Sequence, residues 1–84
     1  MKINKQYIID FLFQKLNKTG ILSSFDKPYE LDFLENAIID SVEFFKFSLE
    51  LEVEFDIHFS EDELLDKKFR NIEGLCEIIL RKLS

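Results

Sequence analysis

A carboxylate and a hydroxyl stand side by side at Asp40 and Ser41, where an isoleucine pair ends and a strongly apolar run begins. A serine hydroxyl can carry a covalently attached group, and an aspartate at a helix start accepts hydrogen bonds from free backbone N–H groups. Glu43 follows Asp40 by three residues, which is the spacing of a capping box. The pair therefore predicts the start of a helix, and taken alone Ser41 is an ordinary first-turn serine.

The rest of the chain offers no second set of residues that predicts an active site. His58 is the only histidine and Cys76 the only cysteine, so a catalytic dyad would need the two to meet without a third group to orient them. No paired Cys/His spacing predicts a zinc site. We expect Cys76 in the core of the last helix, His58 in a bend, no metal site, and a protein that is not itself an enzyme.

Four helices are expected to position these residues. The spacing of apolar residues predicts a first helix over Asn4–Leu16, a second over about Ser41–Phe55, and a last helix capped by Asn71. Ser60 and Glu63 predict another capping box at the start of a short third helix. The predicted fold is all-α: a small four-helix bundle that forms a single domain over residues 1–84.

The segment Ile21–Ile39 separates the first two helices. It holds the only proline and two adjacent serines, and its apolar residues follow no sustained period. We expect a long ordered loop with one helical turn. Four of its side chains are expected to hold it against the core: Phe25, Tyr29, Leu31 and Phe33.

Apolar residues at helical spacing predict the buried faces of the helices. On the first helix they are Ile8, Phe11, Leu12 and Leu16, and on the last helix Ile72, Leu75, Cys76, Ile79 and Leu83. With no disulfide or metal expected, a domain of 84 residues needs a core dense in large side chains, and ten phenylalanines supply it.

The second helix carries apolar residues on two nearly opposite sides. One stripe, which we expect to face the core, consists of Phe44, Phe47, Leu51 and Phe55. The other, here called the outer stripe, consists of Val42, Phe45, Leu49 and Val53, and charged residues lie between the two at Glu43, Lys46, Glu50 and Glu54. The outer stripe either packs against the loop or another helix, or is exposed and binds a partner.

Charge and hydropathy limit the possible partners. The chain has 11 basic and 17 acidic residues and a net charge of −6, which disfavours nucleic acid and favours protein partners with basic patches. No run is long enough to span a membrane, and the N-terminal stretch lacks the pattern of a signal peptide. A lone cysteine fits a reducing compartment, so we expect a cytoplasmic monomer.

The residues around Asp40 and Ser41 resemble a known family. D-S-V at positions 40–42, after an irregular loop and at the start of the second helix, is similar to the D-S-L motif of carrier proteins, which include acyl carrier proteins and the aminoacyl and peptidyl carriers. The lead-in DFLENAIIDS (32–41) and the helix end EVEF (52–55) are also similar to the family pattern. The resemblance covers about two thirds of the chain.

The resemblance implies a function and its residues. Ser41 would carry a 4′-phosphopantetheine arm from coenzyme A, and Asp40 would cap the helix and assist the Mg²⁺-dependent phosphopantetheinyl transferase. Further partners would be an acyl- or aminoacyl-loading ligase and a downstream acyltransferase or synthase. The residues implied in partner contact are Val42, Glu43, Phe45, Lys46, Leu49, Glu50 and Val53.

The implied cargo is an acyl group in fatty-acid, polyketide or related biosynthesis. The alternatives are an aminoacyl or D-alanyl type of carrier, or an unmodified helical interaction module that uses the outer stripe.

Four positions depart from the family pattern, the first being Val42, which stands where leucine is usual. Lys46 and Val53 stand where many fatty-acid carriers have acidic residues, which makes the partner face more apolar and less acidic. Ala37 replaces a glycine that the family often has before the motif. If the backbone needs a positive φ in this segment, we expect Asn36 to adopt it, because asparagine tolerates that region better than alanine.

Overall fold

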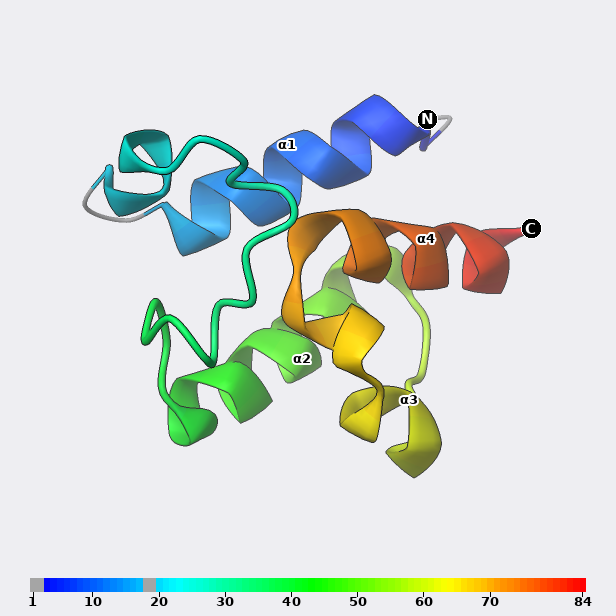
Figure 1. The fold of residues 1–84 in the computed structure, drawn as a ribbon. Helices are drawn as coiled ribbons and strands as arrows, with labels where there is room; N and C mark the ends of the chain where they lie inside the picture. Colours follow the sequence, from blue (N-terminus) through cyan, green and yellow to red (C-terminus); the bar gives the residue numbers. More distant parts are fainter. Residues whose placement is uncertain (1–2, 18–19) are drawn as a thin grey trace.

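The computed structural model describes residues 3–17 and 20–84. Its helices are α1 (Lys5–Leu16), α2 (Ser41–Phe55), α3 (Glu61–Leu65) and α4 (Ile72–Leu83), with two 3-10 helices, η1 (Ile21–Ser24) and η2 (Lys67–Arg70) (Figure 1). These residues contain no strand. The predicted all-α bundle, its short third helix and the single helical turn in the long loop are confirmed; η2 was not predicted.

A side-chain cap starts each α-helix. Asn4 accepts a hydrogen bond from the Tyr7 N–H at the start of α1, and Asn71 accepts one from the Gly74 N–H at the start of α4. At α3 the predicted capping box is complete, because Ser60 and Glu63 each bond the other's backbone N–H. The local polar pattern therefore fixes where the helices begin.

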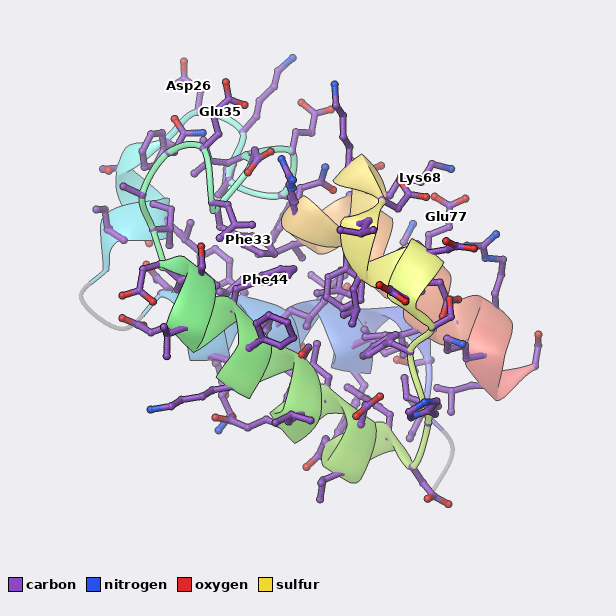
Figure 2. All side chains as sticks on the ribbon, turned by 90° about the horizontal axis from the view of Figure 1, so that it is seen from below. Asp26, Phe33, Glu35, Phe44, Lys68 and Glu77 are labelled. Atoms are coloured by element: carbon purple, nitrogen blue, oxygen red, sulfur yellow. The ribbon has the colours of Figure 1, made fainter. Side chains whose placement is uncertain are left out.

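The core lies between α1, α4 and the inner face of α2. Aromatic rings from successive elements pack against one another in it. The ring centre of Phe33 in the loop lies 6.1 Å from that of Phe44 in α2, which lies 5.4 Å from that of Phe69 in η2. Figure 2 shows Phe33 and Phe44 pointing toward one another in the interior. These rings bind the long loop and η2 to α2.

Helix α4 is buried on a wider arc than the sequence predicted. It packs against α1 on one side and η2 on another, which buries Ile78 and Gly74 in addition to four of the five predicted residues, all except Leu83. A Cβ at position 74 would overlap the Lys68 carbonyl oxygen, so only glycine allows η2 to approach this closely.

The prediction that Leu83 lies in the core is wrong, and Tyr29, which was predicted to hold the loop against the core, is only loosely packed. Leu83 is 37% exposed because it lies in the last turn of α4, at the edge of the molecule (Figure 1). Tyr29 is 44% exposed, since its ring meets Phe13 of α1 only edge-on, at 5.7 Å. Phe33 is buried as predicted, and Phe25 and Leu31 are half-buried.

Candidate functional site

Asp40 and Ser41 form the start of α2. Asp40 has an extended backbone, and its Oδ1 accepts a hydrogen bond from the Glu43 N–H at 2.8 Å, so its predicted capping role is confirmed. Ser41 is the first helical residue, and its side chain is exposed. The cap fixes the backbone on which the Ser41 hydroxyl is presented to solvent.

The lead-in to α2 is folded back on itself by backbone hydrogen bonds. The Phe33 carbonyl accepts hydrogen bonds from the N–H groups of Ile38, at 2.9 Å, and Ile39, at 3.2 Å. The Phe33 N–H in turn donates to the Arg70 carbonyl in η2, at 2.8 Å. The residues that precede Ser41 are therefore tied to η2 as well as to α2.

The reversal in this lead-in occurs at Ala37, whose φ is +57°. The prediction that Asn36 adopts the positive φ is wrong. Asn36 instead completes a turn with Asp32, whose carbonyl accepts both the Asn36 backbone N–H, at 3.0 Å, and its side-chain amide, at 2.9 Å. Those two bonds hold Asn36 in the turn, so the following residue makes the change of direction.

A surface hollow of about 550 Å³ lies beside Ser41. Its walls come from the lead-in, the first residue of α2, and η2. The lining residues are Leu34, Glu35, Ala37, Ile39, Asp40, Ser41 and Arg70. Arg70 was missed by the sequence analysis, because nothing in the sequence indicated that η2 would lie next to the start of α2.

The outer stripe of α2 is exposed. Val42, Phe45, Leu49 and Val53 are 64%, 63%, 59% and 84% exposed, whereas Phe44, Phe47, Leu51 and Phe55 on the opposite face are buried. Of the two interpretations of this stripe, packing within the domain is therefore wrong. The stripe begins at Val42, the residue that follows Ser41, and continues to Val53, near the C-terminal end of α2.

A second hollow, of about 560 Å³, lies along the C-terminal half of this stripe, between α1 and α2. Leu49 and Val53 line it together with Lys15 of α1 and with Lys46. The outer face of α2 thus offers both apolar side chains and amino groups. Lys15 was not predicted as part of this face, because the packing of α1 against α2 could not be placed from the sequence.

The acidic residues of α2 are only partly available to partners. The Glu50 carboxylate lies 3.4 Å from the Lys15 ammonium, and Glu54 accepts a hydrogen bond from the Tyr7 hydroxyl at 2.9 Å. That hydrogen bond, with slight burial and the Glu54 charge, raises the pKa of Tyr7. Glu43 and Lys46 are exposed. Glu50 and Glu54 therefore help to fasten α1 to α2.

His58 and Cys76 lie in different surroundings. His58 is exposed in the bend after α2, with its Nδ1 3.1 Å from the Glu52 carboxylate, which also accepts the Phe59 N–H. Cys76 is buried in α4, as predicted, and burial raises the pKa of its thiol. A thiol that is harder to ionise is a poorer nucleophile.

Over residues 3–17 and 20–84, no three His, Cys, Asp or Glu side chains are grouped so that they could hold a metal ion. None of the helices described is both long and apolar enough to cross a membrane.

Comparisons with protein-family models, with curated proteins and with solved structures found no match to this chain.

Proposed function

We propose that this protein is a carrier protein of the acyl-carrier type, which bears a 4′-phosphopantetheine arm on Ser41. One observation carries the proposal: an exposed serine is the first residue of α2, directly ahead of an exposed apolar stripe on the same helix. A carrier needs an accessible attachment hydroxyl and, close to it, a surface that partner enzymes recognise. Both lie on α2.

The residues around Ser41 fit a phosphate ester. The first N–H groups of a 15-residue helix have no partner within the helix, and the helix dipole is positive at this end. Arg70 lines the adjacent hollow, and a guanidinium is a strong donor to phosphate oxygens. This set of donors suits the anionic group through which the arm would be attached.

Each residue then has a distinct task. The arm supplies the thiol that holds an acyl group as a thioester. The Ser41 hydroxyl provides the attachment point, and Asp40 caps α2 while its carboxylate faces the transferase that installs the arm. Transferase, loading ligase and synthase would each bind the outer stripe together with Lys46.

We propose fatty-acid, polyketide or related biosynthesis as the setting, with an acyl cargo delivered to partner enzymes. An aminoacyl or D-alanyl cargo is the alternative within the same class. Lys46 and Val53 favour partners whose recognition surface is less basic than that of enzymes serving strongly acidic carriers.

A second candidate function comes from the outer stripe alone. Four large apolar side chains exposed along one helix suit an interaction module that binds a partner protein without any modification. In that case Ser41 would serve only as a helix residue, and a Ser41→Ala protein would keep its function.

The experiment that tests the proposal is intact mass spectrometry after incubation with coenzyme A, Mg²⁺ and a broad-specificity phosphopantetheinyl transferase. The wild type is expected to gain the mass of one phosphopantetheine. Ser41→Ala should gain nothing, and Ser23→Ala, at another exposed serine, should gain the same mass as the wild type.

Thermal unfolding of the three proteins controls for folding. Because the Ser41 side chain is exposed, its removal should leave the melting temperature nearly unchanged. A folded wild type that gains no mass would contradict the proposal and favour the interaction module.

A further inference from the structure

The hollow beside Ser41 contains one basic side chain. Of the described residues that line it, only Arg70 carries a positive charge, whereas Glu35 and Asp40 carry negative charges. Arg70 forms no ion pair and no side-chain hydrogen bond within the described part of the chain. Its guanidinium is therefore available to an anion that enters the hollow.

The backbone of Arg70 is fixed from three sides. Its carbonyl accepts the Phe33 N–H at 2.8 Å, which ties it to the lead-in of α2. The preceding residue, Phe69, is fully buried, with its ring 4.7 Å from Phe59 and 5.4 Å from Phe44. The following residue, Asn71, caps α4. Arg70 is thus held at a set place on the wall of the hollow while its side chain stays partly exposed.

The same hydrogen bonds connect Arg70 to Ser41. Phe33 donates to Arg70 and accepts from Ile39, and Ile39 is separated from Ser41 only by the capping residue Asp40. The two sides of the hollow are therefore joined through the backbone of a single residue, Phe33, which links the Arg70 backbone to the start of α2.

The charges of the hollow explain why an arginine matters there. The Glu35 and Asp40 carboxylates would repel a phosphate attached to Ser41. A guanidinium offsets that repulsion, since it presents a planar set of N–H donors that can bond two phosphate oxygens at once. Leu34, Ala37 and Ile39 add an apolar surface beside it.

We propose that Arg70 binds the phosphodiester of the arm on Ser41 and holds the first part of the arm in the hollow lined by Leu34 and Ile39. This inference rests on the proposed function, because it requires the arm to be attached at Ser41. It assigns to η2 a role in positioning the arm, and it makes Arg70 a binding residue.

The test compares the unmodified and modified forms of the wild type, Arg70→Gln and Lys67→Gln by NMR. Lys67→Gln is a matched control, because it removes one positive charge from the same short helix at an exposed residue that does not line the hollow. The readouts are the Arg70 side-chain Nε–Hε resonance, the backbone amides of residues 34–41, and the ³¹P resonance of the phosphodiester.

On modification of the wild type, the Arg70 Nε–Hε signal and the amides around Ile39 are expected to shift together. Arg70→Gln should lose the amide shifts at Leu34 and Ile39 and change the ³¹P resonance, while Lys67→Gln should behave like the wild type. Arg70→Lys should retain part of the effect, because it keeps the charge but not the bidentate geometry.

Two results would overturn the inference. If Arg70→Gln accepts the arm and shows the same shifts as the wild type, Arg70 does not bind it, although the carrier function stands. If the folded wild type accepts no arm at all, the proposed function fails and the inference fails with it.

Discussion

Ala37 adopts a backbone conformation that alanine rarely takes. Its φ of +57° lies in the left-handed region, which costs a residue with a Cβ about 1–2 kcal/mol. The turn requires it, because the Ile38 and Ile39 N–H groups can both reach the Phe33 carbonyl only after the chain has reversed. This strain lies three residues before the Asp40 cap, and strained backbone often occurs near functional sites.

Ala37→Gly should therefore stabilise the protein. Glycine removes the Cβ penalty, and its greater loss of backbone entropy on folding cancels part of the gain, so the free energy of unfolding should rise by about 0.5–1 kcal/mol. Urea unfolding measures it. The reverse change at Gly20, whose φ is +76°, is the control: Gly20→Ala should lower stability by about 1 kcal/mol, although a Cβ there meets no atom within 4 Å. A loss of stability in Ala37→Gly would contradict this explanation.

At the residue scale, the residues with local signals are predictable from the sequence, and those whose place depends on packing are not. Asp40 was predictable because capping depends on the residue itself and the next three. Arg70 had no such signal, since it reaches the hollow only through the hydrogen bond between its carbonyl and Phe33. The positive φ was predicted at Asn36 because asparagine tolerates that conformation better than alanine. The hydrogen bonds that place it at Ala37 are visible only in the folded structure.

At the scale of elements, the helix starts were predicted well and the connections less well. The caps at Asn71 and Ser60 act over one turn of chain, so the sequence alone reveals them. Helix η2 contains no apolar period, and its place depends on Phe69 entering the core and on Gly74 leaving room for the Lys68 carbonyl. Both conditions come from tertiary packing.

An ion pair between side chains links the short helix α3 to α4. The Lys82 ammonium lies 2.8 Å from the Glu63 carboxylate and 5.9 Å from the centre of the Phe59 ring. Slight burial tends to raise the pKa of Glu63, but the hydrogen bond from Lys82, bonds from Ser60 and the Lys82 charge outweigh it. The net effect is a pKa below the usual carboxyl value.

This lowered pKa predicts a pH-dependent attachment of α3. A carboxyl whose pKa is lower in the folded state than in the unfolded state stabilises the fold above its unfolded pKa, and this contribution is lost as the pH falls through the folded pKa. Lys82→Gln should therefore reduce the free energy of unfolding at neutral pH. The difference from the wild type should shrink as the pH falls below about 4.3, the usual pKa of glutamate.

Urea unfolding of both proteins at a series of pH values measures this difference. Lys27→Gln is the matched control, since Lys27 and Glu30 form a pair 3.9 Å apart whose side chains are both largely exposed, and such pairs contribute little. A difference between Lys82→Gln and the wild type that stays constant across the acidic range would show that Lys82 acts only through its contact with Phe59.

At the scale of the whole molecule, α2 lies with one face on the core and the other in solvent. The hydropathy pattern of α2 is almost equally apolar on both faces, so the sequence could not decide between a central helix and an edge helix. That choice depends on where the loop and α4 pack. The loop reaches the inner face, where Phe33 contacts Phe44 and Phe47, and leaves the outer stripe uncovered.

The two faces of α2 predict stability effects of very different size when a phenylalanine is replaced by alanine. Phe45 is 63% exposed and Phe47 is 7% exposed, although they lie two residues apart. Phe45→Ala combined with Leu49→Ala should change the free energy of unfolding by no more than about 1 kcal/mol, since isolated surface changes stay within about 0.5 kcal/mol each. Phe47→Ala should lower it by about 3–5 kcal/mol through the cavity it leaves.

The double variant Phe45→Ala with Leu49→Ala, which should barely affect stability, should strongly affect partner binding. If the outer stripe is the surface that enzymes recognise, truncating two of its large side chains should lower the kcat/KM of a phosphopantetheinyl transferase for Ser41 by about ten-fold or more, because central apolar contacts dominate protein interfaces. This variant leaves Val42, Val53 and the Asp40 cap unchanged, so both ends of the stripe and the start of α2 are preserved. A double variant that unfolds would place the outer stripe in the core. A folded double variant modified at the wild-type rate would show that the transferase recognises Ser41 through the hollow and the helix start alone.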